Sequence, residues 1–250
     1  MLRSILFVIW IYGTMVVLAF LCLPWMAVSR AGAREPVRFW IRGVRQALNL
    51  IIGAKTEYRG LENIPEGGLL IASKHQCMYD AFTPWLVLSD PAIIIKRELL
   101  WYPIFGWYAF RSDMIPIDRG GRSKTLKRMY EEARKRTDKG RQVLIFPEGT
   151  RRAPGAPPAY KSGVYALYKD LGVPCVPVAH NAGLCWPAHG VRRRPGRMIF
   201  EYLPALPPGL SKEDFMQRLE AAIEPACERL LNEGLEAQGR ARADLAEVLP

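Results

Sequence analysis

The sequence has no internal repeat, no low-complexity tract and no cysteine pattern that would hold a metal. Its five cysteines include no C-x-x-C pair and no histidine at zinc-ligand spacing, as expected for free thiols in a reducing compartment. The basic segments also lack interleaved aromatic residues and a recognisable recognition helix, so we expect no nucleic-acid partner. These absences exclude repeat arrays, zinc or disulfide scaffolds, and nucleic-acid binders.

Charge is absent from a long stretch near the N-terminus. No charged residue occurs between Ser4 and Ser29, and the first twenty residues of this run would measure about 30 Å as a helix, one hydrocarbon thickness. A cleaved signal peptide has a shorter apolar region that ends at a small-x-small site, and this run has neither property. The pattern predicts a retained membrane anchor over residues 1–30, which either spans the bilayer or dips into one leaflet as a hairpin.

Positive charge is abundant in the rest of the chain, with 35 Lys and Arg against 24 Asp and Glu. Such a surplus suits nucleic acid, an anionic membrane or a phosphorylated substrate, so the net charge alone does not identify the partner. Five arginines follow the apolar run, at Arg30, Arg34, Arg38, Arg42 and Arg45. Because positive residues stay on the cytoplasmic side of a membrane segment, we expect the catalytic part on the cytoplasmic side of the inner cell membrane.

The arginine-rich segment, residues 31–54, reads as a basic amphipathic helix. Trp40, Val44 and Leu48 recur at helical spacing, and the arginines fall on the opposite side. An interfacial helix on a membrane and an ordinary core-packing helix fit this pattern equally well.

Residues 55–210 alternate short apolar runs with amphipathic stretches, as is typical of an α/β domain. We expect strands at 68–73, 92–96, 114–117, 142–146, 175–179 and 197–202, and helices at 79–88 and 123–137. Residues 211–250 read as a C-terminal helix with a polar tail. Ser211 and Asp214 form the capping signal at its start.

A histidine and an aspartate stand five residues apart in the segment KHQCMYD, positions 74–80. On one continuous helix, His75 and Asp80 would be about 140° apart, but a turn between them would let the carboxylate accept the imidazole N–H. That bond would leave the other ring nitrogen free to take a proton. A surface histidine beside a helix-start aspartate is the non-catalytic alternative. A hydrolase with Cys77 as nucleophile is another, although side chains two positions apart seldom face each other.

Two further predicted strands end in groups suited to phosphate. IPIDRGG, at 115–121, places Arg119 before a glycine pair, and LIFPEGTRR, at 144–152, ends an apolar strand in charged residues. An Asp118–Arg119 ion pair and a plain turn with solvated arginines are the structural alternatives. VPCVPVA, at 173–179, reads as a buried strand. His180 and His189 follow it without a nearby carboxylate in the sequence, so we expect no catalytic role for them.

Taken in order, these four segments resemble the glycerolipid acyltransferase family. That family has a His-x4-Asp motif, a block ending in Ile-Asp-Arg, a Phe-Pro-Glu-Gly-Thr-Arg block and a late Val-Pro block, and all four occur within residues 75–179. The sequence departs from the family at Lys74, where many members have Asn, and at Cys77, where Ser is frequent. The resemblance implies a single glycerol-3-phosphate acyltransferase-like α/β domain with a central mixed sheet, plus an N-terminal membrane-embedded helical segment.

The resemblance also implies an activity, the transfer of a fatty acyl group from acyl-CoA or acyl carrier protein to the sn-2 hydroxyl of 1-acylglycerol-3-phosphate. It makes His75 the general base and Asp80 its orienting partner, with Arg119 on the acceptor phosphate and Lys96 near the thioester. The residues that shape the acceptor pocket would be Glu148, Gly149, Thr150 and Arg151. The reaction implies no metal and no cofactor besides the acyl donor. Two alternatives are another lysolipid acceptor, such as lyso-ornithine lipid, and a non-catalytic module that binds anionic membrane lipid.

Overall fold

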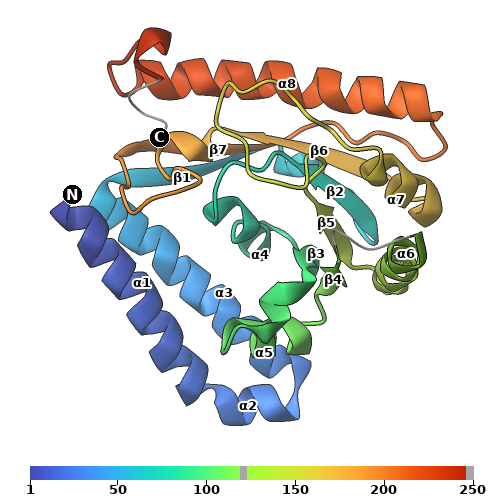
Figure 1. Ribbon diagram of the computed structural model, residues 1–250, viewed down its shortest axis with the longest axis horizontal. Coiled ribbons are helices and arrows are strands. Elements are labelled where there is room, and N and C mark those ends of the chain that lie inside the picture. Colours follow the sequence, from blue (N-terminus) through green and yellow to red (C-terminus); the bar gives the residue numbers. More distant parts are fainter. Residues whose placement is uncertain (119–122, 246–250) are drawn as a thin grey trace.

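In the computed structural model, which describes residues 1–118 and 123–245, seven strands of the described chain form one sheet between two layers of helices (Figure 1). The strand order is β1-β7-β6-β2-β5-β3-β4. All neighbouring strands are parallel except β6 and β7, so the predicted mixed sheet is confirmed. The strands are β1 (Ala54–Arg59), β2 (Leu69–Ser73), β3 (Pro91–Lys96), β4 (Ile115–Ile117), β5 (Gln142–Ile145), β6 (Cys175–His180) and β7 (Gly196–Tyr202).

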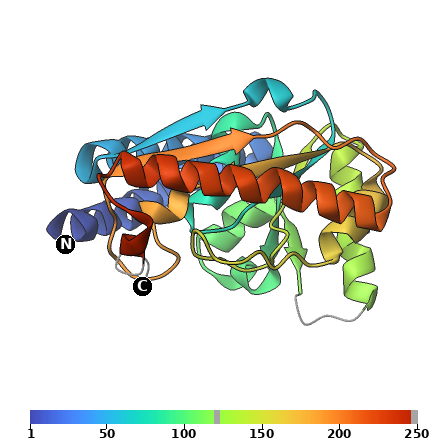
Figure 2. The ribbon, with the colours of Figure 1, turned by 90° about the horizontal axis from the view of Figure 1, so that it is seen from above.

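Helices α6, α7 and α8 cover one face of the sheet, and α3, α4 and α5 cover the other (Figure 1). Figure 2 shows α8 lying along the sheet over β6 and β7. The helices are α1 (Leu2–Leu21), α2 (Leu23–Val28), α3 (Arg30–Ala47), α4 (Pro84–Val87), α5 (Phe105–Arg111), α6 (Ser123–Thr137), α7 (Gly163–Leu171) and α8 (Lys212–Glu236). A π-helical turn, Leu48–Ile52, continues α3.

The central strand β2 shows how the two layers are held. Successive side chains of a strand point to opposite faces of the sheet. Leu70 and Ala72 therefore belong to the core with α6, α7 and α8, while Leu69 and Ile71 belong to the core with α3, α4 and α5. All four are buried, which explains why the strand is a continuous apolar run and not an alternating one.

The six predicted strands are present, and α6 has the predicted bounds. Strand β1 was not predicted because its sequence, AKTEYR, is mostly polar and only Ala54 is buried. The predicted helix over 79–88 is wrong. That segment forms a 3₁₀ helix, η3 (Tyr79–Ala81), and the short α4, because Pro84 starts a new helix at the position where its missing N–H is tolerated.

The flanking helices pack into the core of the α/β domain. The Ser211 hydroxyl accepts the N–H of Asp214 at 3.1 Å, so the predicted cap of α8 is confirmed. Phe215 and Leu219 of α8 are buried in the same cluster as α6 and α7. The apolar side of α3, including Ile41, is likewise buried against the α/β domain, while the interfacial position of this helix on a membrane stays a prediction.

Candidate active site

The site lies at the edge of the sheet where the parallel strands β6, β2, β5 and β3 end. Crevices at the carboxyl ends of strands are the usual ligand sites of open α/β sheets. His180 ends β6, His75 lies just beyond β2, Phe146 follows β5 and Lys96 ends β3. Residues more than one hundred positions apart in the sequence are thereby gathered at one edge.

His75 and Asp80 form a hydrogen-bonded dyad at this edge. The Nδ1 atom of His75 lies 2.9 Å from Oδ1 of Asp80, because the chain bends at Cys77 and Met78, before η3, instead of continuing as a regular helix. The imidazole stacks on the Phe146 ring, with centroids 3.9 Å apart. Asp80 can only accept, so Nδ1 carries the hydrogen. Within the described part of the chain, the imidazole makes its hydrogen bond through Nδ1 and none through Nε2. The Nε2 atom is therefore available to a substrate.

The Asp80 carboxylate is fully buried and has several donors. Its Oδ2 atom accepts the backbone N–H groups of Gln76 at 2.7 Å and of Cys77 at 2.9 Å. Burial raises the pKa of Asp80, but the charge and hydrogen bond of His75 and the other donors outweigh it and leave this pKa below its usual value. The carboxylate is therefore ionised and can stabilise an imidazolium.

His180 is a part of the site that sequence reasoning missed. Its Nε2 atom lies 3.5 Å from Oδ2 of Asp80 and 2.8 Å from the Lys74 carbonyl oxygen, and its Nδ1 atom accepts the N–H of Ala182 at 3.3 Å. Nε2 therefore carries the hydrogen, and burial lowers the pKa of this imidazole, which keeps it neutral. The expectation that no carboxylate lies near His180 was wrong, because the pairing of β6 with β2 brings Asp80 to it.

The lowered pKa of Asp80 predicts a stability that depends on pH in the acid range. A carboxyl whose pKa is lowered by folding stabilises the fold at pH values above its pKa in the unfolded chain, which is about 3.9. This contribution is lost as the pH falls through the lower pKa of the folded state. We expect the free energy of unfolding to fall more steeply from about pH 5 to pH 3 in the wild type than in Asp80→Asn. Denaturant titrations across this range give both slopes. Equal slopes would mean that the carboxyl is not selectively ionised in the fold.

Cys77 does not act as a nucleophile. Its side chain is fully buried in a cluster with Tyr79 and Trp186. Burial raises the pKa of this thiol well above its usual value, so the reactive thiolate is not formed. The hydrolase alternative is therefore wrong, and Cys77 serves as a small core residue.

Lys74 ties the segment after β5 to helix α8. Its Nζ atom lies 3.0 Å from Oε1 of Glu148 and 2.8 Å from Oε1 of Glu224, and the lysine and Glu148 side chains are buried. Glu224 also accepts a hydrogen bond from the Tyr160 hydroxyl at 2.5 Å. The backbone N–H of Arg152 donates to the His75 carbonyl oxygen at 2.8 Å, so the segment is held at both Lys74 and His75.

The other predicted site residues occupy different positions along the same edge. Gly149 has a φ of 67°, a left-handed conformation that favours glycine, while Thr150 is exposed. Lys96 is exposed beside Glu98, with 3.1 Å between Nζ and Oε1. Its strand, β3, is two strands from β2, a separation of roughly 10 Å. Arg119 lies outside the described residues.

Two guanidinium groups interact electrostatically with Cys77, two residues after His75. Arg151 donates from Nη1 to the Ala188 carbonyl oxygen at 3.2 Å. Arg193, in the same loop as Ala188, places its guanidinium 4.4 Å from the ring centre of Trp186. Burial, with a smaller effect from the charge of Arg151, lowers the pKa of Arg193 to about 10. Sequence reasoning gave the arginines of this loop no role in the site, since nothing in the sequence brings them together with Cys77.

Comparison with known proteins gives consistent results. A family model described as Acyltransferase matches residues 55–181. A 1-acyl-sn-glycerol-3-phosphate acyltransferase of Pseudomonas aeruginosa is 36% identical over 82% of this chain and 80% of its own length. A protein of the same name from Limnanthes alba is 30% identical over 62% of this chain. The matched region covers only 56% of the Limnanthes protein.

A solved structure has the same fold. The crystal structure of the 1-acyl-sn-glycerophosphate (LPA) acyltransferase PlsC from Thermotoga maritima superposes with a TM-score of 0.77 and covers 92% of this chain and 96% of its own. At 20% identity this likeness shows the fold alone.

Proposed function

The chain belongs to the acyltransferase family, and from this premise we propose that it transfers a fatty acyl group from an acyl thioester to the sn-2 hydroxyl of 1-acylglycerol-3-phosphate, forming phosphatidic acid. The names of its relatives support this acceptor. The observation that carries the proposal is the dyad, in which an ionised, buried carboxylate holds Nδ1–H of His75 and leaves Nε2 open.

The proposed reaction uses His75 as a general base. Its Nε2 atom takes the hydroxyl proton as the oxygen attacks the thioester carbonyl, and Asp80 stabilises the imidazolium that forms. When the tetrahedral intermediate collapses, the C–S bond breaks and the proton passes from His75 to the leaving sulfur. The thioester is already activated, so the acyl group moves in one transfer without an acyl-enzyme. General-base assistance of this kind contributes roughly 10²–10⁴ in rate.

The acceptor phosphate requires cationic groups near the dyad. In the described part of the chain we propose Arg151 and Arg193 for this role, because both interact electrostatically with Cys77, and we extend the proposal to Arg119 on the family resemblance. Glu148, Gly149 and Thr150 are proposed to shape the pocket, with Glu148 acting through its bond to Lys74. Lys96 is proposed to lie near the thioester.

The site is proposed to work at a membrane, with helix α1 lying in one leaflet. Among the described helices, α1 is the one that is long and apolar enough to cross a membrane, with a mean hydropathy of 2.4. However, both of its ends contact the catalytic domain. The Ser4 hydroxyl accepts the N–H of Arg193 at 2.9 Å, and the Ala19 carbonyl oxygen accepts the Tyr108 hydroxyl at 2.9 Å.

A helix fixed at both ends along one domain cannot reach the far side of a bilayer while that domain stays on the near side. This geometry supports the hairpin alternative over a full span. The arginines after the apolar run support the cytoplasmic side of the inner membrane as the location. Membrane lipid, the lysophospholipid acceptor and acyl-CoA or acyl carrier protein are then the proposed partners.

An acceptor panel tests the function. Purified full-length protein in mixed micelles is given labelled acyl-CoA or acyl carrier protein thioester with lysophosphatidate, monoacylglycerol or lyso-ornithine lipid. We expect phosphatidate, with a kcat/KM at least about tenfold higher for lysophosphatidate than for monoacylglycerol, because charge-assisted hydrogen bonds to the phosphate are lost. Preference for the ornithine lipid would reassign the acceptor. Lipid binding without transfer to any acceptor would favour the non-catalytic alternative.

A further inference from the structure

An unusual concentration of exposed aromatic side chains follows strand β3. The 3₁₀ helix η4 (Arg97–Trp101) leads through a short turn into α5. Trp101 is 81% exposed and Phe110 is 73% exposed. Three further exposed aromatic residues lie between them: Tyr102, Phe105 and Trp107. Soluble proteins seldom expose so many large apolar groups in ten residues, so this surface needs a partner.

The inner side of this segment is fixed to the N-terminal helices. Tyr108 is buried in a cluster with Ala19 and Met26, and its hydroxyl bonds to the Ala19 carbonyl oxygen. Arg111 donates from Nε to the Met26 carbonyl oxygen at 3.0 Å and from Nη2 to that of Ala27 at 3.0 Å. The aromatic segment and the turn between α1 and α2 therefore form one connected unit.

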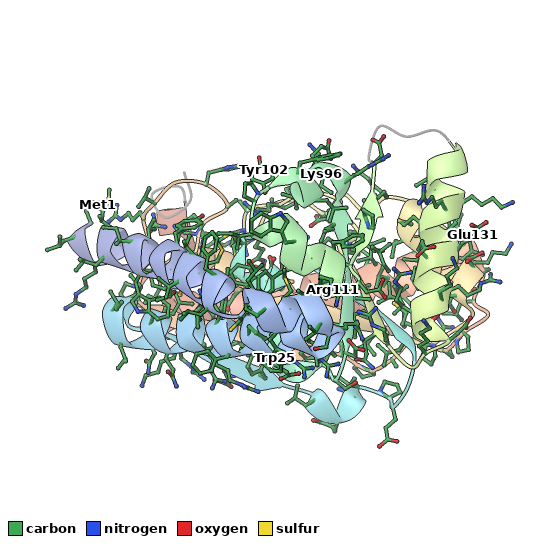
Figure 3. The ribbon with its side chains drawn as sticks, turned by 90° about the horizontal axis from the view of Figure 1, so that it is seen from below. Met1, Trp25, Lys96, Tyr102, Arg111 and Glu131 are labelled. Atoms are coloured by element: carbon green, nitrogen blue, oxygen red, sulfur yellow. The ribbon has the colours of Figure 1, made fainter. Side chains whose placement is uncertain are left out.

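The two parts also lie side by side. Figure 3 shows η4 and α5, with Tyr102 and Arg111 labelled, beside α1 and α2 on the face seen from below. Helices α1 and α2, which Tyr108 and Arg111 join to this segment, also expose apolar side chains, among them Ile9, Phe20 and Trp25.

We propose that residues 101–110 form a second membrane-inserting element, which enters the same leaflet as α1. The proposal rests on the membrane location proposed above. Trp and Tyr prefer the boundary between headgroups and acyl chains, which matches the composition of this segment. Continuity with the apolar side of α1 favours lipid over a protein partner, because a single flat leaflet covers both surfaces at once.

The element has a consequence for the reaction. The 3₁₀ helix η4, which leads into the segment, begins directly after Lys96 at the end of β3, and β3 belongs to the sheet edge that carries His75. Insertion of residues 101–110 fixes this edge close to the lipid surface, where the acceptor hydroxyl lies. The segment is a positioning element and does not touch the reacting atoms.

Depth-dependent quenching tests the proposal without any requirement for activity. A fluorophore is attached to Phe110→Cys in a Cys22→Ser background, because the other four cysteines are buried. The matched control carries it at Leu61→Cys, an exposed apolar position after β1, at the far edge of the sheet. Both full-length proteins are reconstituted into phosphatidylcholine–phosphatidylglycerol vesicles with brominated acyl chains.

We expect bromolipid to quench the label at position 110 and not the one at position 61. Quenching of the label at position 110 by aqueous iodide alone would overturn the proposal. Protection from both quenchers would also overturn it, by showing that a second copy of the chain covers the segment. Because the readout is optical, a chain that failed the acceptor panel would still give a clear result here.

A rate measurement adds the functional consequence. We expect the double variant Trp101→Ser/Phe110→Ser to lose about tenfold in the rate of acylation of lysolipid embedded in vesicles, because apolar contact with the leaflet is reduced. Its rate in detergent mixed micelles should match that of the wild type. Equal losses in vesicles and in micelles would show a folding defect and contradict the positioning role.

Discussion

Replacing His75 with alanine is expected to reduce kcat by roughly 10²–10⁴, because general-base assistance to the acceptor hydroxyl is lost. The fold should survive, since the side chain lies at the edge of the sheet and its loss removes one hydrogen bond, to Asp80, and the stacking contact with Phe146. The measurement is the steady-state rate of phosphatidate formation, with the thermal unfolding midpoint recorded on the same preparations.

His189 provides the matched control for this prediction. It stands in the loop after β6, and we assign it no part in the site. His189→Ala should retain the wild-type rate. A His75→Ala protein that stayed folded and kept its rate would remove the base from the mechanism. A comparable loss in His189→Ala would point to a general effect of histidine replacement.

Replacing Lys74 with methionine is expected to lower the free energy of unfolding by about 3–5 kcal/mol, because the buried charge of Glu148 loses its hydrogen-bonded cation and keeps only Arg152, at 3.9 Å. Burial lowers the pKa of Lys74, but the hydrogen bonds and charges of Glu224 and Glu148 raise it by more than burial lowers it. The pKa is therefore above its usual value, and the lysine is charged in the fold. The site would also loosen, since Glu148 lies in the segment that is tied to His75. Denaturant unfolding of the full chain in micelles measures the loss.

Replacement of an exposed lysine is the control that separates the loss of a buried ion pair from the loss of a surface ion pair. Lys135 pairs with Glu132 on the surface of α6, with 2.7 Å between Nζ and Oε1. Lys135→Met should cost at most about 1 kcal/mol, as surface pairs do. If Lys74→Met cost no more than Lys135→Met, the buried network would not be a structural tie. Adding Glu148→Gln to Lys74→Met should recover part of the stability, because the uncompensated charge is then removed.

Local patterns were enough to predict helix α6 and every strand of the described sheet except β1. A buried strand such as β2 is a short apolar run, and α6 has apolar residues at helical spacing. The spacing of His75 and Asp80 was likewise informative, because only a turn can bring them together, and the chain does bend between them, at Cys77 and Met78. In each case the signal lies within a few residues of the feature that it predicts.

The features that were missed depend on contacts between distant segments. His180 meets Asp80 only because β6 pairs with β2, and Lys74 meets Glu224 only because α8 returns across the sheet. The packing of α1 against the domain also depends on a distant contact, since the Ser4 hydroxyl accepts the backbone N–H of Arg193. The sequence shows that an apolar helix is present, but its orientation along the domain depends on the whole fold.

A double-mutant cycle on the dyad tests the central claim most directly. The variants are His75→Ala, Asp80→Asn and the two combined, and kcat for phosphatidate formation is measured for each folded protein. If the carboxylate acts through the imidazole, each single change removes most of the activity and the combined variant is scarcely slower than His75→Ala. If the two losses multiply instead, Asp80 and His75 act independently and the site is not a dyad.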